Sequence, residues 1–535
     1  MYKTVIGLEV HCELKSNSKN FSSSRNSYST IPNSNVSVVD LGMPGILPVV
    51  NKQAVRNSIK MALAMNCDVP EYLTFERKNY FYPDLPKGYQ ITQFKHPIGT
   101  NGYVMINVNG EDKKVLIHDT HLEEDTASLD HYNAYSLIDY NRCGVPLLET
   151  VTEPCLNSAD EAIAFLETLR SIFLYCDTSY ARSDRGQIRC DVNVSLMKEN
   201  DTKLGTKVEM KNINSFSSVR EAILCEVARQ TEILNNGGTI LQETRRYDEN
   251  ENTTYTMRSK EDAIDYKYFT DPNLPPVKLS CEWIEEIRKE IPTLQYERSN
   301  MYINDYGISR KDAYTIVKEK EISDYYDECI NLGGDPVLVC NWLTGSVIGN
   351  MNKLGITIKE VPLTPQMLVD LIKLITDGKI SGKQGKEVLE KSLETRKDPK
   401  VLVSEMGLSQ ITDETEIINI IKSVLDENET AIWSLLLASG YLKALSVEKI
   451  EEKTIGVYEE ARENVKPLDR MKRSEVIKSV REETKDNTRV QIEMKRREVP
   501  YQDVDMDRIA AYTEKALGRA ARLGGKIAVL GSGKS

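Results

Sequence analysis

The first part of the chain, residues 1 to about 280, alternates short apolar runs with glycine and proline turns, a pattern typical of strands and a few helices. The opening residues, Met1–Ile6, predict a first strand rather than a signal peptide. Tyr103–Val108 and Lys114–Ile117 predict a hairpin, because the Asn109-Gly110 pair between them suits a turn that needs positive φ.

One well-marked helix interrupts these strands. Ser158 and Glu161 have the spacing of a capping box at its start. The apolar residues that follow at helical spacing predict its buried face: Phe165, Leu166, Leu169, Ile172 and Phe173. Strands combined with separate helices predict an α+β domain with a mixed sheet over residues 1–280.

The pattern changes after the prolines at Pro272–Pro276. Helical spacing dominates from Cys281 onward, as in Trp283–Arg288, Pro365–Ile375 and Glu387–Leu393. We therefore expect an all-helical domain over residues 281–428, followed by a tail of different composition over residues 429–535.

Composition places the chain among ordinary globular proteins, with 40% hydrophobic and 28% charged residues. Its net charge of −12 argues against a general nucleic-acid binder, although local clusters such as Lys203, Lys207 and Lys211 are present. No apolar run approaches the ~20 residues that span a bilayer. The ten cysteines have no repeated spacing, which predicts reduced thiols and a cytoplasmic protein with no membrane partner.

Three polar clusters lie between apolar residues in the first domain. Glu9 and His11 alternate in one strand, His121 to Asp125 form the second cluster, and Asp139 to Glu149 form the third. Imidazole and carboxylate groups are ligands for a divalent cation, and Mg²⁺ holding phosphate prefers oxygen donors. These clusters predict an enzyme that handles phosphoryl groups.

Six stretches in this region are too particular to be generic. In order they are Gly7–His11, Arg77–Gln90, Asp139–Glu149, Arg189–Ser195, Lys207–Phe216 and Glu243–Asp248. With these motifs the chain resembles the GatB family, the B subunits of the aspartyl/glutamyl-tRNA(Asn/Gln) amidotransferases. The resemblance runs from residue 3 to about residue 428, roughly four-fifths of the chain.

The resemblance implies a carbon–nitrogen ligase that uses ATP and Mg²⁺. The B subunits of the family phosphorylate the side-chain carboxylate of Glu or Asp on a mischarged tRNA. Ammonia, released from glutamine by the amidase (GatA) of the heterotrimer, then displaces the phosphate, and the small third member (GatC) braces the pair. The products are Gln-tRNA(Gln) or Asn-tRNA(Asn), and the sequence does not distinguish between these two substrates.

The resemblance also implies roles for individual residues. It makes His11, Glu124 and Glu149 metal ligands. The candidate catalytic residues are Glu9, Lys78 and Asp191, and the candidates for holding nucleotide or aminoacyl group are Lys78, Arg142, Glu209 and Lys211. The alternative is that these charged residues form an ion-pair network with a purely structural role, since such networks also bring acidic and basic residues together.

The chain departs from the family pattern in two places. The family often carries a zinc site, but its four cysteine positions here are Ser22, Ser24, Ser37 and Asp40, so we expect no zinc. The tail over 429–535 lacks the signature of the family's tRNA-binding tail domain, and we expect it to pack poorly. Two alternatives therefore stay open: a divergent paralogue that amidates another carboxylate, and a non-catalytic scaffold that binds the amidase.

Overall fold

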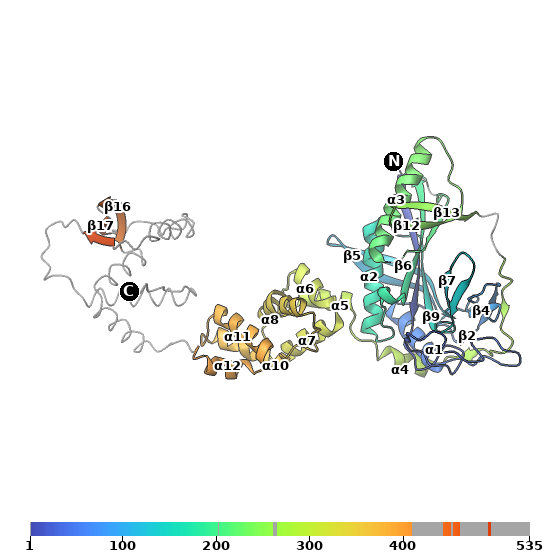
Figure 1. The fold of residues 1–535 in the computed structure, drawn as a ribbon, viewed down its shortest axis with the longest axis horizontal. Coiled ribbons are helices and arrows are strands. Elements are labelled where there is room, and N and C mark those ends of the chain that lie inside the picture. The colour runs from blue at the N-terminus through green and yellow to red at the C-terminus, as the bar shows by residue number, and fades with distance from the viewer. Residues whose placement is uncertain are drawn as a thin grey trace. The chain divides into compact units, whose positions relative to one another are not determined.

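A mixed eight-stranded sheet forms the centre of the first half of the chain (Figure 1). The computed structural model describes residues 2–201, 203–213, 215–259 and 265–408, together with the backbone of three later strands. The strand order is β13-β12-β11-β10-β1-β9-β6-β5, and its neighbours pair antiparallel except β11 and β12, which are parallel. The bounds are β1 Tyr2–Glu13, β5 Gly99–Val108, β6 Glu111–Glu124, β9 Pro146–Thr152, β10 Ile188–Lys198, β11 Val208–Lys211, β12 Glu243–Asp248 and β13 Thr253–Ser259.

The predicted hairpin is confirmed as β5 and β6. Val108 pairs with Glu111, and the two residues between them, Asn109 and Gly110, have φ of 53° and 93°. Positive φ at both central residues is the requirement of a type I′ turn, which matches the twist of the two strands.

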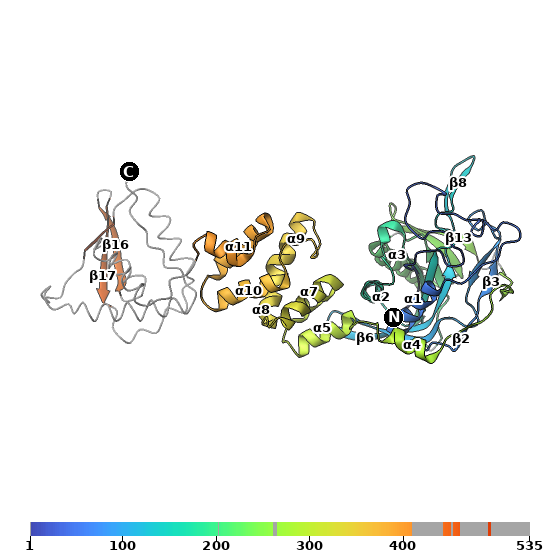
Figure 2. The same ribbon diagram turned by 90° about the horizontal axis from the view of Figure 1, so that it is seen from below.

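Three helices, α1 (Lys52–Ala64), α2 (Ala159–Tyr175) and α3 (Phe216–Asn235), pack against the sheet. In both views α2 and α3 lie on one side of the sheet, and the small strands lie toward the other side (Figures 1 and 2). The predicted apolar face of α2 is fully buried, and each large side chain in it stabilises the fold by about 1.5–3 kcal/mol.

The start of α2 differs from the prediction in one detail. The Ser158 hydroxyl accepts from the amide of Glu161 at 3.1 Å, as expected of an N-cap. The Glu161 carboxylate accepts instead from the amide of Asn157 at 2.6 Å, because the Lys113 ammonium holds it at 2.6 Å. The predicted capping box therefore forms only its first half.

Shorter strands form three small sheets beside the main one. They are β14-β3-β4 (Phe269–Thr270, Glu76–Asn79, Tyr89–Thr92), β15-β2 (Val277–Lys278, Tyr72–Leu73) and the hairpin of β7 (Ser128–His131) with β8 (Ser136–Asp139). The polar-aromatic segment Arg77–Gln90 thus begins and ends in strands, and Lys78 lies on β3.

The rest of the described chain is helical, as predicted from residue 281 onward. The helices are α4 Cys281–Arg288, α5 Gln295–Asn304, α6 Arg310–Val317, α7 Lys320–Asn331, α8 Pro336–Trp342, a π-helical turn Leu343–Val347, α9 Ile348–Leu354, α10 Pro365–Thr376, α11 Gly382–Thr395 and α12 Pro399–Glu405. A 3₁₀ turn at Ser183–Arg185 precedes β10. The α+β fold followed by a helical region is confirmed.

Compact packing divides the chain at Val361, although the sequence predicts a boundary near residue 280. Helices α4 to α9 belong with the sheet in the unit Met1–Val361, and α10 to α12 belong to the unit Pro362–Ser535. The Tyr175 hydroxyl of α2 donates to the carbonyl of Val317 at 2.8 Å and lies 2.7 Å from the Ser323 hydroxyl, which joins α6 and α7 to the sheet domain.

The tail contains three strands whose backbone is described: β16 Leu442–Ile450, β17 Lys453–Glu460 and β18 Val490–Glu493. They form one small sheet in the order β16-β17-β18. The prediction that the tail packs poorly concerns side chains outside the described residues. Among the helices that the structure describes, none has the length and apolar character needed to span a membrane.

Candidate active site

Strand alternation builds a polar row on one face of the central sheet. Leu8, Val10 and Cys12 of β1 are buried in the same apolar core as α2, so Glu9 and His11 point to the opposite face. Directly paired residues share a face of the sheet. The register pairs His11 with Glu149 and Arg189, Glu9 with Asp191, and Glu149 with His121, so all six side chains lie on the face opposite the helices.

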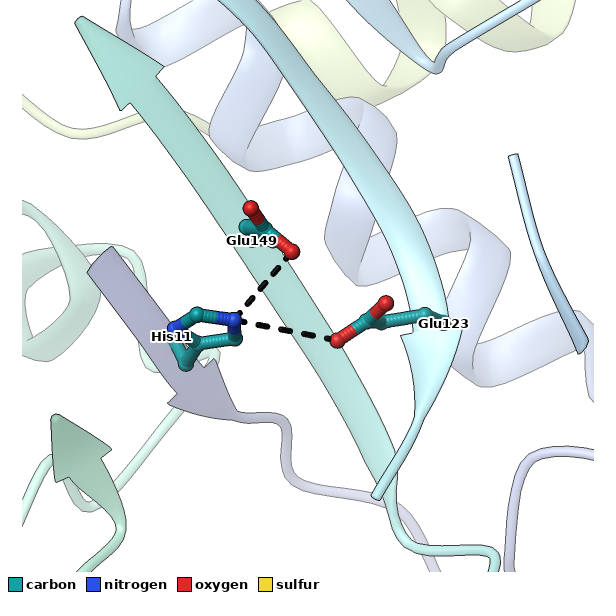
Figure 3. A group of neighbouring side chains, drawn as sticks. All are labelled: His11, Glu123 and Glu149. Carbon is teal, nitrogen blue, oxygen red and sulfur yellow. Dashed lines mark ion pairs between the residues drawn. The ribbon is translucent and has the colours of Figure 1, made fainter. Parts of the chain in front are cut away.

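The first cluster on this face consists of His11, Glu123 and Glu149 (Figure 3). The Nε2 atom of His11 lies 3.1 Å from Oε2 of Glu149 and 3.9 Å from Oε1 of Glu123. One ligand atom from each residue falls within 4.8 Å of the others. His121 also contacts Glu149, with Nε2 at 3.2 Å, and Asp119 orients the other side of this ring at 2.8 Å. One imidazole and two carboxylates fit a Mg²⁺ ion that keeps positions free for phosphate oxygens.

Glu124 does not lie in this cluster, although the sequence groups it with His11 and Glu149. Its carboxylate forms an ion pair with the Lys87 ammonium and accepts from the amide of Ile91 at 2.9 Å. Adjacent side chains on a strand point to opposite faces, so Glu123 occupies the expected place. The two-residue spacing from His121 to Glu123 is the signal in the sequence that identifies it.

The charges of the first cluster are strongly coupled. Burial lowers the pKa of His11, but Glu149 and Glu123 more than reverse this effect, so the pKa lies above the ordinary 6.5. Burial likewise opposes the positive form of His121, yet Glu149 and Asp119 hold its pKa well above 6.5. Burial raises the pKa of Glu149, but His11 and His121 outweigh it and hold that pKa well below its ordinary value. Without a metal, these shifts favour an imidazolium–carboxylate network.

A second acidic cluster adjoins the first. Carboxylate oxygens of Glu9, Asp191 and Glu209 lie within 4.8 Å of one another. The Lys211 ammonium contacts Asp191 at 2.5 Å and Glu209 at 3.0 Å. Burial and the charge of Glu149 raise the pKa of Glu9, so the two clusters influence each other.

Lys78 approaches from the small sheet. Burial lowers the pKa of its ammonium, but the charges of Glu123 and Glu149 raise it to a net value above normal, so Lys78 interacts electrostatically with the first cluster. The Tyr266 ring lies 5.0 Å from this nitrogen. The structure therefore places Glu9, Asp191, Glu209 and Lys211 beside the first cluster, with which Lys78 also interacts.

Arg142 was predicted to hold the nucleotide or aminoacyl group, and that role stays a prediction; its observed contacts are with the segment after β6. Its guanidinium donates to the carbonyls of Thr126 and Ala127, both at 2.9 Å, and lies 3.6 Å from Asp125. Asp125 also pairs with Arg189 at 2.6 Å. Arg142 is thus bound to the segment that follows β6, and Arg189, paired with His11 on the sheet, is a site-face cation that the sequence did not single out.

The four positions that resemble the family's zinc site meet in space. Oδ1 of Asp40 accepts from the hydroxyl of Ser22 at 2.7 Å, and Oδ2 accepts from Ser24 at 2.5 Å and from the amide of Ser37 at 2.8 Å. The fully buried Lys19 ammonium lies 3.4 Å from Oδ2. We call these five residues the Asp40 knot. Its side chains satisfy one another, and the absence of zinc stays a prediction.

We expect the Asp40 knot to contribute strongly to stability. Asp40→Asn removes the only anion that contacts the buried Lys19 ammonium in the described structure, and a broken buried pair costs about 3–5 kcal/mol. Urea unfolding measures the loss. Asp177→Asn is the matched control, because its pair with Lys15 is exposed and should contribute little. Equal stability of the two variants would contradict the buried pair.

The neighbours Glu123 and Glu124 offer a direct comparison. Glu123→Gln removes an anionic ligand and should weaken Mn²⁺ binding by about 10- to 100-fold. Glu124→Gln should leave Mn²⁺ affinity almost unchanged but destabilise the fold, because Lys87 loses its buried partner. Titration of each variant with Mn²⁺, followed by electron paramagnetic resonance, separates the two. A larger loss of Mn²⁺ affinity in Glu124→Gln than in Glu123→Gln would show that Glu124 is the ligand.

We also expect opposite pH dependences for metal affinity and for the stability of the metal-free protein. The raised pKa of His11 and His121 contributes stability that is complete below about 6.5 and is lost as the pH rises through the folded-state values. Metal must displace these protons, so affinity for Mn²⁺ should increase over the same range. Calorimetry in buffers of different ionisation enthalpy detects the released protons, and binding without proton release would contradict the charge network.

With this geometry defined, known proteins can be compared with the chain. Residues 4–285 match the family profile of the GatB/GatE catalytic domain, and residues 324–437 match that of the GatB domain. The sheet with its polar face is therefore the catalytic domain of this class.

Relatives in several bacteria align along most of the chain, and each is named as the B subunit of an aspartyl/glutamyl-tRNA(Asn/Gln) amidotransferase. The relative from Brevibacillus brevis is 44% identical over 457 residues, 85% of this chain and 96% of the relative. The one from Halalkalibacterium halodurans is 48% identical over 432 residues, 81% and 91% of the two chains. The one from Carboxydothermus hydrogenoformans is 43% identical over 484 residues, 89% and 99%.

The chain belongs to the family of B subunits of the aspartyl/glutamyl-tRNA(Asn/Gln) amidotransferases. The resemblance that the motifs indicated is thereby confirmed. The alignment with the Carboxydothermus relative covers 89% of the chain, more than the four-fifths that those motifs span.

Proposed function

We propose that this chain is the part of a heterotrimeric ligase that activates and amidates the side-chain carboxylate of Glu-tRNA(Gln), Asp-tRNA(Asn) or both. The observation that carries the proposal is the group of His11, Glu123 and Glu149, with the Lys211 cluster beside it. The match of residues 4–285 to the GatB/GatE catalytic domain supports the same function.

The reaction has two steps with balanced chemistry. The carboxylate oxygen attacks the γ-phosphorus of ATP, the bond to the β-phosphate oxygen breaks, and ADP leaves. Ammonia then attacks the carbonyl carbon of the acyl phosphate, phosphate leaves, and a proton is lost from nitrogen. A carboxylate alone is a poor acyl donor, so phosphorylation supplies the leaving group.

The residues of the site fit these steps. His11, Glu123 and Glu149 would hold Mg²⁺, which neutralises charge on the transferring phosphoryl group. Lys78 is half-buried and interacts electrostatically with Glu123 and Glu149, so its ammonium is suited to a phosphate or carboxylate oxygen there. Lys211, held by Asp191 and Glu209, is directed toward the same face and suits a second phosphate contact. Glu9, whose pKa is raised, is suited to accept a proton from the attacking ammonia.

The proposal includes the other two chains of the heterotrimer and the setting. The amidase (GatA) would release ammonia from glutamine, the small third member (GatC) would brace the complex, and the complex would act in the cytoplasm. The paralogue and the scaffold have no observation in their favour. Buried carboxylates are costly to keep, so a scaffold would have no physical need for the first cluster.

The test is an amidation assay of the purified heterotrimer. Glu-tRNA(Gln) and Asp-tRNA(Asn) are each incubated with ATP, Mg²⁺ and glutamine, and the attached amino acid is identified after deacylation. Amidated product that requires ATP supports the proposal. A complex that hydrolyses glutamine but amidates neither tRNA would refute it.

A further inference from the structure

A β-bulge interrupts strand β6 shortly before the first cluster. Ile117 and Asp119 pair with consecutive residues of β9, so His118 between them is an extra residue in the ladder. The His118 ring is largely exposed, and its Nδ1 atom lies 2.8 Å from the carboxylate of Glu153. Bulges are common next to active sites, where they redirect a neighbouring side chain.

The bulge decides which face of the sheet Asp119 occupies. Ile117 and Asp119 are two residues apart, so a regular strand would direct both side chains to the same face. Ile117 is buried in the apolar core, whereas Asp119 lies on the opposite face, where its Oδ1 atom is 2.8 Å from Nδ1 of His121. The extra residue therefore turns a carboxylate away from the core and toward the site.

Asp119 fixes the ring of His121. An ionised carboxylate only accepts hydrogen bonds, so Nδ1 of His121 donates its hydrogen to Asp119. This bond sets the orientation of the ring and thereby the position of Nε2, which lies 3.2 Å from Oε2 of Glu149. Carboxylates that accept from the far nitrogen of a histidine commonly orient the groups around a metal site.

Glu149 receives support from two rings, and only one of them is free to give it when a cation is bound. Its Oε2 atom is 3.1 Å from Nε2 of His11 and 3.2 Å from Nε2 of His121, and β9 lies between β1 and β6 (Figure 3). Nε2 of His11 would be a ligand atom, and it cannot bind a cation and donate to Glu149 at the same time. His121 would then be the ring that keeps Glu149 in place.

The other carboxylate of the first cluster has a support of its own. The hydroxyl of Thr92, on the small sheet, donates to Oε2 of Glu123 at 3.2 Å. His121 is farther from Glu123, with Nε2 at 3.9 Å from Oε2. Loss of Asp119 should therefore disturb Glu149 more than Glu123.

We propose that Asp119 is a positioning residue for the reaction, which holds the carboxylate of Glu149 in place through the ring of His121. The inference rests on the proposed function, because it takes Glu149 as a ligand of the catalytic cation. It adds a residue that acts without touching cation or substrate. It also gives the β-bulge at His118 a role, which is to turn Asp119 toward this ring.

The first test is a double-mutant cycle on the amidation rate of the complete complex at saturating ATP and Mg²⁺. Asp119→Leu should lower kcat by about 10- to 100-fold, the usual effect of removing a supporting carboxylate. KM for the aminoacyl-tRNA should stay within about twofold, because Asp119 would not contact the substrate. In a His121→Gln background, Asp119→Leu should lower kcat no further, because the ring through which it acts is gone. Glu111→Leu, an exposed carboxylate on the same strand, is the matched control and should change neither constant.

The ring of His121 gives a second readout that does not depend on activity. The chain contains five histidines, so a proton–nitrogen NMR spectrum of the metal-free protein labelled in histidine has few ring signals. The Nδ1–H signal of His121, assigned by its loss in His121→Gln, should exchange slowly with water in the unmodified protein and rapidly in Asp119→Leu. Thermal unfolding checks the fold, and Asp119→Ala takes the place of Asp119→Leu if the larger apolar side chain is not tolerated.

Three results would overturn the proposal. One is a normal kcat in Asp119→Leu, and another is an Nδ1–H signal of His121 that stays protected in this variant. The third is an equal loss of kcat with and without His121, because Asp119 would then act through its charge and not through the ring. If the unmodified complex amidates neither tRNA, the proposed function alone is refuted, and the ring signal still decides whether Asp119 holds His121.

Discussion

Glu149→Gln should lower ATP-dependent amidation by roughly 1000-fold, equivalent to about 4 kcal/mol of transition-state stabilisation. Glu149 contacts both His11 and His121 and supplies one of the two carboxylates of the first cluster. The amide keeps the size of the side chain but removes the charge that a cation and both imidazoles require. Mn²⁺ affinity should fall together with the amidation rate.

Two controls accompany Glu149→Gln. Glutamine hydrolysis by the partner enzyme should persist, because that reaction lies on another chain. Glu153→Gln, on an exposed carboxylate paired with His118, should leave amidation unchanged. Amidation by Glu149→Gln at a rate near normal would remove the first cluster from the mechanism.

Lys78→Met should lower the amidation rate by roughly 100-fold, while Mn²⁺ affinity rises. The two effects have opposite signs because the ammonium interacts with the charges of Glu123 and Glu149. Without it, the carboxylates attract a metal ion more strongly, but no cation stabilises the developing phosphoryl charge. A residue with a purely structural role would not strengthen metal binding when removed.

The control for Lys78→Met is Lys95→Met, which changes an exposed lysine of the neighbouring loop and should alter neither quantity. Lys78→Arg keeps the charge and should recover part of the rate. Parallel loss of rate and Mn²⁺ affinity in Lys78→Met would show instead that the substitution disrupts the cluster.

The local sequence pattern is sufficient to predict structure where interactions between nearby residues determine it. Asn109 and Gly110 predict the β5–β6 turn because the backbone there needs positive φ. The apolar stripe of α2 identifies its buried face because helical spacing places these residues on one side. Helices α4, α10 and α11 contain the segments in which helical spacing was predicted.

Which residues lie in the site depends on the pairing of strands that are far apart in the sequence. Glu123 and Glu124 are neighbours in the chain, but the pairing of β6 with β9 places His121 opposite Glu149, and alternation then directs Glu123 rather than Glu124 to the cluster. Arg142 lies within a conspicuous motif, but hydrogen bonds to Thr126 and Ala127 hold it at the segment after β6. The spacing from His121 indicates Glu123 only once the pairing of β6 with β9 has placed His121 beside Glu149, and no spacing in the sequence indicates the position of Arg142.

The sequence by itself determined the α+β class, the helical region that follows it and the family, because motifs and periodicity are properties of short stretches of chain. Tertiary structure decided that Lys78 interacts with Glu123 and Glu149, that Lys211 contacts both Asp191 and Glu209, and that α4 to α9 belong to the same compact unit as the sheet. It also brought Ser22, Ser24 and Ser37 together around Asp40. These contacts join residues far apart in the chain, and only the register of strands and the packing of loops fix them.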